Sequence, residues 1–490
     1  MSTEPAPSQV SGTIGSSAFW VTASSVGSQI IRFSVFVVLA RLVSPSEFGT
    51  VAIASVLIDV FSLIAIAGIS EALVMKKQLT EEDADTAFWT NLGVGFIFLV
   101  IGLAVSPLAA KVFDAPQLGP VLAVLSLTFV IWPFGASHTA RMSRELQFKA
   151  LALRTLIANL IGAVVGIAMA FNGYGVWALV ARSLITTITL VIMSWIAYPW
   201  RPRFRFSIDA LHALFGVGSK LMGGQLVGQI NGRGVELIAG LLITPATVGV
   251  LRIGGQCFNL LQQISVAPIA AIAMPLLART QGDPVAGREV FAKMCRLSAL
   301  TIYPVFFGTM SVSSIIFPLT FGADWALTGA VMPLLCAMAI PLQFNLLMSA
   351  GLASRGAANV ILKWNMLQAV VGLPLSAVGG LFGLFPLLIF TIARSYLLLP
   401  FGLAWLRRNT ELEPRILVMS SIAPLVASIL MAGGVLAIRP FLEAYLGPWI
   451  VLAVVIPMAG LFYASLVLTL SANMRREVWI WWRQRRLAAT

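Results

Sequence analysis

Residues 86–106 read TAFWTNLGVGFIFLVIGLAVS and contain no charged side chain. A helix needs about 20 apolar residues to cross the hydrocarbon core of a bilayer, whereas a transmembrane β-strand needs about 10. The strands of a membrane barrel also alternate apolar and polar side chains, and this stretch does not alternate. The stretch therefore predicts a membrane-spanning α-helix.

Similar apolar stretches fill the rest of the chain. Of its 490 residues, 59% are hydrophobic and 10% are charged, and the mean hydropathy is +0.93. A soluble domain carries about 25% charged residues, so we expect this chain to be surrounded by lipid and to be an all-α polytopic membrane protein. About 14 transmembrane helices are expected, joined by connections too short for an extramembrane domain. Their predicted bounds are 16–41, 48–72, 86–106, 119–138, 151–171, 175–198, 212–241, 248–273, 294–317, 328–350, 360–379, 384–405, 416–437 and 448–471.

Basic residues give the chain a net charge of +13. They are dispersed between the apolar runs and fall mostly on alternate connections, as at Lys76, Arg141 and Arg203, so no nucleic-acid partner is expected. The positive-inside rule assigns these connections to the cytoplasm, which places both termini there and requires an even number of spans. Residues 1–17 contain no base, so the first apolar segment is expected to remain as a span.

Two short sequences recur along the chain. LVSP at 42–45, followed by Gly49, recurs 200 residues later as LITP at 242–245, followed by Gly249, and Ala-Arg-Ser at 181–183 recurs at 393–395. A parallel repeat is one recurrent build of secondary transporters, with substrate bound between the halves. The expected divisions are a cytoplasmic N-terminal tail (1–15), a six-helix N-lobe (16–205), a six-helix C-lobe (206–410), two C-terminal helices (411–472) and a basic, aromatic cytoplasmic tail (473–490), which lies at the headgroups or binds a protein partner.

Polar side chains three or four residues apart form stripes on single faces of several predicted spans. A charge within a bilayer needs a partner, a water-filled space or a function, so the stripes predict an aqueous, net-cationic cavity between the lobes. The candidate substrate-binding residues are Arg32, Arg233, Arg252, Arg182, Arg394, Gln29, Gln225, Gln229, Gln256 and Asn259. Two structural alternatives stay open: hydrogen bonds that join helices, and an i,i+3 salt bridge between Arg233 and Glu236.

Residue patterns typical of enzymes are missing from the sequence. Cys257, Cys295 and Cys336 show no metal-ligand spacing and lie in or beside apolar segments, where they are expected to pack as small hydrophobes. There is no phosphate-cradling Gly-Lys-Ser/Thr loop, and the only two histidines, His138 and His212, lie near predicted cytoplasmic boundaries. We therefore expect a transporter rather than an enzyme, with no catalytic residue, no metal and no cofactor.

Three segments resemble those of a known family. They are ARLVSPSEFG at 40–49, LTEED at 79–83 followed by TAFW at 86–89, and GYGVWALV at 173–180. These look like the signatures of Wzx-type polysaccharide flippases of the multidrug/oligosaccharidyl-lipid/polysaccharide superfamily, and are most similar to its colanic-acid and succinoglycan-like exopolysaccharide export branch. The resemblance implies a MATE/MurJ-like fold of two parallel-repeat six-helix lobes plus two C-terminal helices. It also implies a protein of the bacterial inner membrane that flips undecaprenyl-diphosphate-linked oligosaccharides for exopolysaccharide or lipopolysaccharide biosynthesis by alternating access.

Such a lipid diphosphate would suit a cationic cavity. The planar fork of arginine matches phosphate oxygens, and glutamine and asparagine suit sugar hydroxyls. The prenyl tail can stay in the lipid while the headgroup crosses, which avoids placing sugar in hydrocarbon. Membrane lipids and a polysaccharide polymerase or co-polymerase are further candidate partners.

Two other functions remain as alternatives. An ion-coupled drug or metabolite antiporter on the same fold would favour acids in its cavity when it exports cations, whereas this chain has more arginine than acid there. Asp59 and Glu236 are nevertheless candidates for proton or sodium coupling. A membrane-embedded polysaccharide polymerase or ligase typically carries a large periplasmic loop, and no connection in this chain is long enough for one.

Overall fold

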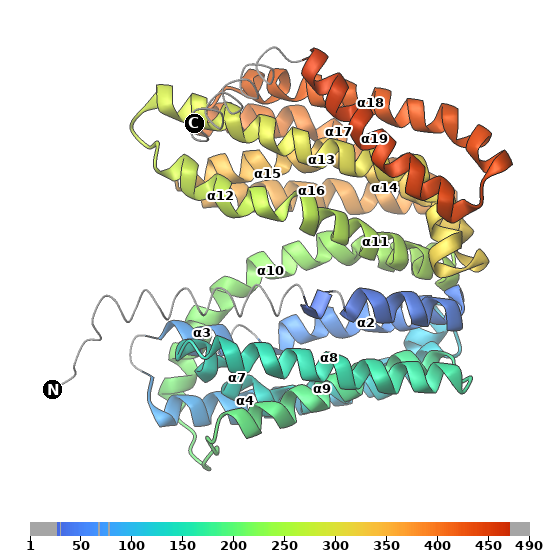
Figure 1. Ribbon diagram of the computed structural model, residues 1–490. Coiled ribbons are helices and arrows are strands. Elements are labelled where there is room, and N and C mark those ends of the chain that lie inside the picture. The colour runs from blue at the N-terminus through green and yellow to red at the C-terminus, as the bar shows by residue number, and fades with distance from the viewer. Residues whose placement is uncertain (1–26, 30, 67–68, 77–78, 471–490) are drawn as a thin grey trace, which may run out of the picture. The chain divides into compact units, whose positions relative to one another are not determined.

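The computed structural model of the protein describes residues 27–29, 31–66, 69–76 and 79–470, and all regular structure in these ranges is helical (Figure 1). The predicted all-α fold is therefore confirmed. Residues 31–42 form a helix, and the further helices are α2 (Pro45–Ile66), α3 (Ile69–Met75), α4 (Glu81–Val112), α5 (Leu118–Leu125), α6 (Thr128–Ile131), α7 (Pro133–Arg144), α8 (Phe148–Phe171), α9 (Val176–Ala197), α10 (Ile208–Leu242), α11 (Pro245–Ser265), α12 (Ala267–Ala278), α13 (Pro284–Phe321), α14 (Ala326–Ala337), α15 (Ala339–Ser354), α16 (Ala358–Gly380), α17 (Leu384–Asn409), α18 (Pro414–Tyr445) and α19 (Pro448–Leu470), with a 3₁₀ turn at Ala323–Trp325.

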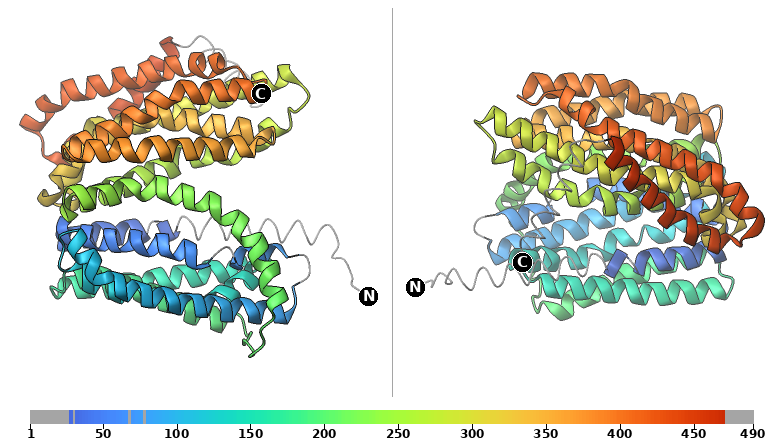
Figure 2. Two further views of the ribbon diagram at one scale, coloured as in Figure 1. Left: turned by 180° about the vertical axis from the view of Figure 1, so that it is seen from behind. Right: turned by 45° about the horizontal axis from the view of Figure 1, so that its top comes forward.

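The chain divides into two compact units, Met1–Gly249 and Val250–Thr490, which we call unit 1 and unit 2. In unit 1, α8 packs along α9, and α10 packs against α2, α3 and α4. In unit 2, α13 packs along α18, α16 along α17, and α18 along α19; Figure 2 shows the helices of each unit from two further sides. Because α10 packs on its own unit's earlier helices, unit 1 extends beyond the predicted N-lobe of 16–205. The transport lobes themselves stay a prediction.

Nine helices within the described ranges are long and apolar enough to cross a membrane, and up to twelve spans result if each of three bent helix pairs counts as one. The remaining two of the fourteen predicted spans are 16–41, of which residues 16–26 and 30 lie outside the described residues, and 212–241, which lies within the 35-residue helix α10. Exposed side chains on these helices are large and apolar, as at Phe96, Val370 and Leu461, which are 57–75% exposed. Such surfaces suit contact with lipid rather than water.

A proline follows each of the three bends. The break between α11 and α12 is a 46° bend just before Pro268, and the break between α14 and α15 is a 42° bend just before Pro341. Proline lacks a backbone N–H and its ring clashes with the carbonyl four residues earlier, so a helix bends there. The third bend, of 45°, lies at Trp132, immediately before Pro133.

The recurring LVSP and LITP sequences start two equivalent helices. Helix α2 begins at Pro45 and α11 begins at Pro245, positions at which the missing proline N–H costs nothing. Before α2, the Glu47 carboxylate accepts hydrogen bonds from the backbone N–H and the hydroxyl of Ser44, at 3.0 and 2.8 Å. Glu47 also accepts from the N–H of Val176 at 3.1 Å, at the start of α9. Two of the segments that carry the family resemblance are thus joined by one carboxylate.

The glycines of this repeat lie against each other's helix starts. A Cβ atom on Gly49 would overlap the carbonyl group of Pro245, and a Cβ atom on Gly249 would overlap that of Pro45. Both glycines belong to unit 1. The contact is reciprocal, as expected when two copies of a repeat meet around a local two-fold relation, and it explains why glycine recurs four residues after each proline.

We predict that Gly249→Ala destabilises the protein, because the new methyl group requires the backbone at Pro45 to move, an overpacking that costs about 1–3 kcal/mol. Gly255→Ala on the same helix is the matched control, since nothing lies within 4 Å of its added Cβ. Alanine is favoured over glycine in a helix by about 0.5–1 kcal/mol, so the control should be neutral or stabilising. Thermal unfolding of the purified proteins in detergent measures both; equal melting temperatures for the two variants would contradict the close contact.

Candidate functional site

Acidic residues crowd the first turn of α4. Glu81, Glu82 and Asp83 lie where the helix dipole favours negative charge. The Thr80 hydroxyl accepts from the N–H of Asp83 at 3.2 Å, and the Asp83 carboxylate accepts from the N–H of Thr80 at 3.0 Å, which completes a capping box. Lys76 pairs with the same carboxylate at 2.6 Å. The start of α4 is therefore fixed by its own sequence.

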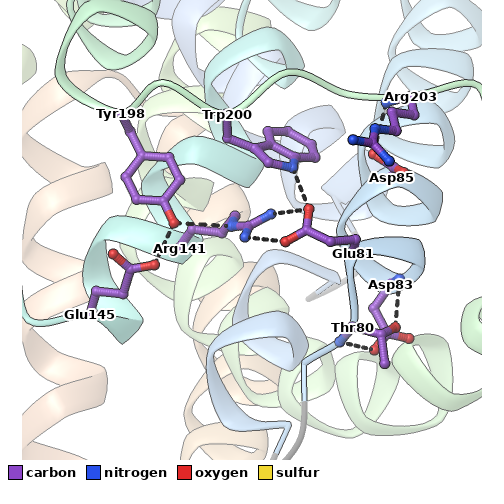
Figure 3. Close-up of polar contacts among 9 residues, drawn as sticks. All are labelled: Thr80, Glu81, Asp83, Asp85, Arg141, Glu145, Tyr198, Trp200 and Arg203. Atoms are coloured by element: carbon purple, nitrogen blue, oxygen red, sulfur yellow. Dashed lines mark hydrogen bonds and ion pairs between the residues drawn. The ribbon is translucent and has the colours of Figure 1, made fainter.

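Glu81 is the centre of a larger polar network (Figure 3). The Arg141 guanidinium of α7 donates to both of its carboxylate oxygens, at 2.8 and 2.6 Å, and the Trp200 indole N–H donates to one of them at 2.8 Å. Arg141 also lies over the rings of Tyr198 and Trp200, 5.6 and 5.2 Å from their centroids. Bidentate and cation–π contacts together hold the guanidinium in one orientation.

Tyr198 extends this network to Glu145. Its hydroxyl accepts from Arg141 Nε at 3.3 Å and donates to the Glu145 carboxylate in a short hydrogen bond. Burial raises the pKa of Tyr198, and the hydrogen bond to Glu145 raises it further, against the opposing effect of Arg141. The phenol therefore keeps its proton at neutral pH and can donate to Glu145.

Further along α4, side chains bind the backbone that connects α9 to α10. The Asp85 carboxylate accepts from the N–H of Arg203 at 2.9 Å, and the Thr86 hydroxyl accepts from the N–H of Ser207 at 3.1 Å. The Trp89 indole N–H donates to the carbonyl of Arg203 at 2.8 Å. We call Glu81, Asp85, Thr86 and Trp89, with Arg141, the linker clamp. The clamp positions residues 198–207 through these contacts, and Asp85 Oδ2 is buried without a hydrogen-bond partner among the described residues.

A second cluster lies between α2 and α10. Arg233 approaches Asp59 with 3.6 Å between Nη2 and Oδ2, and Glu236 with 3.3 Å between Nη1 and Oε1. The predicted i,i+3 pair is therefore present, and Asp59 joins it from the other helix. The three side chains, which we call the ion triad, are 28% (Arg233), 38% (Asp59) and 14% (Glu236) exposed. Both separations exceed the 2.7–2.9 Å typical of charge-assisted hydrogen bonds, so Arg233 is shared loosely between two carboxylates.

Two more arginines of unit 1 lie within range of each other's charge. Arg182 of α9 experiences repulsion from Arg32, whose Nε donates to the carbonyl of Ser28 at 3.2 Å. Among the described side chains, no carboxylate pairs with either arginine. Gly162 and Gly166 of α8 make room for α9 here, because a Cβ atom at either position would crowd the Arg182 backbone or side chain. An arginine without a carboxylate partner within a membrane helix requires water or an anion beside it.

The other predicted site residues divide between the units. Gln29 and Gln229 are half-buried in unit 1, and the side chain of Gln225 lies outside the described part of the structure. Unit 2 contains the remaining four: Arg252 and Gln256, which are half-buried on α11, Asn259, which is exposed there, and Arg394 on α17. A single cavity shared by all ten residues stays a prediction. Arg182 is the seventh residue of α9, and Arg394 is the eleventh residue of α17.

Unit 2 also contains an apolar cavity between α13, α18 and α19. Its volume is about 340 Å³, and its lining includes Val305, Val312, Met431, Val455 and Tyr463. Such a lining can accept hydrocarbon and offers few hydrogen bonds to a polar ligand.

Comparison with known proteins identifies the family. A family model described as "Polysaccharide biosynthesis protein" matches residues 38–328, more than half of the chain. The chain belongs to this family. This result confirms the predicted resemblance to polysaccharide flippases at the level of the family.

Curated relatives of this family member match between about 70% and more than 90% of the chain. The succinoglycan biosynthesis transport protein ExoT of Rhizobium meliloti (strain 1021) is 23% identical over 470 residues, covering 93% of this chain and 92% of the relative. The lipopolysaccharide biosynthesis protein WzxC of Escherichia coli (strain K12) is 24% identical over 368 residues, covering 73% of each chain. The teichuronic acid biosynthesis protein TuaB of Bacillus subtilis (strain 168) is 23% identical over 358 residues, covering 72% of this chain and 73% of the relative.

Solved structures show the fold of this family member. The lipid II flippase MurJ in an inward closed conformation has a TM-score of 0.74 at 14% identity, covering 93% of this chain and 99% of MurJ. An inward-facing multidrug resistance MATE transporter of the MOP superfamily has a TM-score of 0.61 at 14% identity, covering 80% of this chain and 96% of the transporter. The predicted MATE/MurJ-like fold is therefore confirmed. Named transport proteins and flippases among these neighbours agree with the prediction of a transporter rather than an enzyme.

Sequence reasoning missed the linker clamp and the joining role of Glu47. Glu47 and three clamp residues, Glu81, Thr86 and Trp89, belong to the segments that carry the family resemblance, but the resemblance assigns no role to these side chains. The acid-rich start of α4 was a visible signal for a helix N-terminus. Its partners Arg141 and Trp200 lie 60 and 119 residues away, and no local pattern connects them to Glu81.

We predict that Glu81→Ala lowers the melting temperature more than Trp200→Phe does. The first change leaves Arg141 and the Trp200 N–H without their partner, whereas the second removes one hydrogen bond, worth about 1 kcal/mol, and keeps an aromatic ring. Glu82→Ala is the matched control, because Glu82 is an exposed acid in the same helical turn. Differential scanning fluorimetry of purified protein measures the order; a Glu82→Ala effect as large as that of Glu81→Ala would show that helix-dipole loss, not the clamp, is responsible.

Proposed function

We propose that this protein is a flippase that moves undecaprenyl-diphosphate-linked oligosaccharide repeat units across the bacterial inner membrane by alternating access. It would serve exopolysaccharide or lipopolysaccharide biosynthesis. The observation that carries this proposal is that neither Arg32 nor Arg182 has a carboxylate partner among the described residues, with Arg233 of the ion triad in the same unit.

Charge supports an anionic ligand in unit 1. A diphosphate offers several oxygens to guanidinium forks, and each charge-assisted hydrogen bond is stronger than a neutral one. The ion triad supports the same ligand, because Arg233 is held at 3.3 and 3.6 Å and could exchange a carboxylate for a phosphate. The triad itself has two carboxylates for one guanidinium, so the uncompensated positive charge in unit 1 comes from Arg32 and Arg182 rather than from the triad.

The apolar cavity of unit 2 supports a lipid-linked ligand. Helices α13, α18 and α19 line it with aliphatic side chains, and each buried methylene of a prenyl chain would contribute about 0.8 kcal/mol. A free sugar or a soluble metabolite would gain nothing from such a lining. The flippase proposal therefore accounts for cationic and apolar features that an antiporter of small polar solutes would leave unused.

Orientation is part of the proposal. The linker clamp lies with the basic connections that the positive-inside rule assigns to the cytoplasm. Residues 201–206 read RPRFRF, and Phe204 and Phe206 are 92% and 56% exposed. Bases and aromatic rings exposed beside spans are typical of the headgroup region, which supports cytoplasmic placement of both termini.

The test replaces the unit 1 arginines. Arg32→Gln and Arg182→Gln remove charge while keeping polar bulk, and the double variant should lower polymer export at least about tenfold in a cell that lacks its own copy, because charge-assisted hydrogen bonds are worth about 1.5–3 kcal/mol each. Export is measured as cell-surface polysaccharide, normalised to protein in the membrane. Arg288→Gln is the control, because Arg288 forms only an exposed pair with Glu413 at 3.2 Å. Normal polymer export by the double variant at equal protein level would contradict the proposal.

Ion coupling gives a second prediction from the ion triad. If Asp59 or Glu236 carries a proton or sodium ion, then Asp59→Asn or Glu236→Gln should make transport insensitive to an imposed pH or sodium gradient. Glu289→Gln is the control, because Glu289 is exposed on α13. Flipping of a fluorescent lipid diphosphate in proteoliposomes provides the readout; a gradient response that persists in both triad variants would exclude these carboxylates as coupling groups.

A further inference from the structure

Three consecutive helices of unit 2 bring a second polar cluster together. Asn345 lies on α15, Trp364 and Gln368 on α16, and Arg394 on α17. These helices pack against one another in every pairing. We call the four side chains the amide–arginine cluster. Only Arg394 belonged to the residues selected from the sequence.

The contacts within the cluster use some of its polar groups. Asn345 Oδ1 accepts from Trp364 Nε1 at 2.9 Å and from Gln368 Nε2 at 3.3 Å. Arg394 Nη1 donates to the backbone carbonyl of Gln368 at 3.0 Å. The two amides are thereby oriented, with the Asn345 oxygen turned toward α16.

Other polar groups of the cluster have no protein partner. Three atoms make no hydrogen bond to any described residue: Asn345 Nδ2, Gln368 Oε1 and Arg394 Nη2. A fourth, Arg394 Nε, is buried and has no hydrogen-bond partner among the described residues. No carboxylate in the described part of the chain pairs with Arg394. The cluster therefore offers amide and guanidinium donors, one carbonyl acceptor and an uncompensated positive charge.

The cluster faces away from the lipid. On α16 the exposed large apolar residues are Leu362, Met366, Val370 and, ten residues beyond Gln368, Val378. At about 100° per residue, Gln368 lies about 200° from Met366 around the helix axis, which is the opposite face. Trp364 is 4% exposed and packs in a hydrophobic core of unit 2, one helical turn before Gln368.

Room for the guanidinium is provided by Gly372. A Cβ atom there would overlap Arg394, so the glycine leaves the space that the long side chain occupies. A charge at this depth costs several kcal/mol unless it is compensated. A neutral side chain could hold α16 and α17 together without that cost, as the Ser376–Thr391 hydroxyl pair does at 2.8 Å one turn further along. A ligand-binding role explains the charge better than helix packing does.

We propose that the amide–arginine cluster binds the sugar part of the transported headgroup, and specifically a sugar that carries a carboxylate. Amide N–H and C=O groups recognise hydroxyls in pairs, and the arginine fork recognises a carboxylate. This inference rests on the proposed function and adds to it: the unit 1 arginines bind the diphosphate, whereas unit 2 selects the sugar.

Binding by the full-length protein in lipid nanodiscs tests the inference. The probes are the acidic disaccharide of glucuronate linked to glucose, its neutral counterpart cellobiose, and inorganic pyrophosphate, each titrated by calorimetry. Wild type should bind the acidic disaccharide more tightly than cellobiose. Arg394→Gln should weaken acidic-disaccharide binding about tenfold and remove the preference for it, because a charge-assisted hydrogen bond is lost. Gln368→Ala should weaken both disaccharides.

Matched controls separate recognition from folding. Tyr396→Phe on α17 removes a hydrogen bond to the carbonyl of Ala337 outside the cluster and should leave both affinities unchanged. Arg394→Lys keeps the charge without the fork and should fall between wild type and Arg394→Gln. Each variant must retain the wild-type melting temperature within a few degrees. If Arg394→Gln is less stable than that, the disaccharide affinities of Gln368→Ala decide whether the sugar site exists.

The outcomes distinguish this inference from the flippase proposal. Pyrophosphate binding should be unaffected by Arg394→Gln and lost in the Arg32→Gln/Arg182→Gln double variant. Unchanged disaccharide affinities in both Arg394→Gln and Gln368→Ala, or no saturable disaccharide binding by wild type, overturn the sugar site alone. A third outcome combines two results: Arg394→Gln loses the preference for the acidic disaccharide, and the Arg32→Gln/Arg182→Gln variant exports polymer normally. That outcome would uphold the sugar site and overturn the diphosphate assignment.

Discussion

Charges in this chain have to be solvated by the protein itself, because the hydrocarbon around its helices offers no hydrogen bonds. The structure meets this constraint in two ways. Some charges are neutralised within the fold, as Arg141 is by both oxygens of Glu81, at 2.6 and 2.8 Å. Others keep their charge without a carboxylate partner among the described residues, as Arg182 and Arg394 do. The difference between these two groups is what separates structural residues from candidate ligand-binding residues.

The linker clamp shows what neutralisation within the fold achieves, at Glu81 and Arg141. Its acids lie at the start of α4, its base comes from α7, and its hydrogen bonds extend to the backbone at Arg203 and Ser207. A segment between two long helices is thereby held at several points, although it forms no regular structure of its own. The same logic applies to Glu47, which caps α2 and also accepts from the start of α9. In both places one carboxylate fixes two helix ends that are far apart in sequence.

Loose or incomplete pairing has a different consequence. The ion triad keeps Arg233 at 3.3 and 3.6 Å from its two carboxylates, longer than charge-assisted hydrogen bonds usually are. The amide–arginine cluster likewise orients its groups through a few internal hydrogen bonds and leaves others open. A transporter needs sites that bind and release, and partially satisfied polar groups meet that need better than saturated ones. The apolar cavity beside α18 and α19 complements them, because a lipid-linked headgroup has an apolar part as well as charged and hydroxylated parts.

Sequence alone determined the features that depend on local composition and spacing. Apolar runs of about twenty residues gave the helical membrane fold, proline and glycine spacing gave the repeat at α2 and α11, and the i,i+3 spacing gave the Arg233–Glu236 pair. These follow from the period of the helix and the length of a bilayer, which operate within one segment. Tertiary structure alone decided which partners each charge received. Asp59 pairs with Arg233 from another helix, and Arg141 pairs with Glu81 across 60 residues of sequence. Asn345 and Gln368 lie in one cluster with Arg394, although neither is charged and neither belongs to the residues selected from the sequence. Packing between helices sets these contacts, and no pattern along a single helix encodes them.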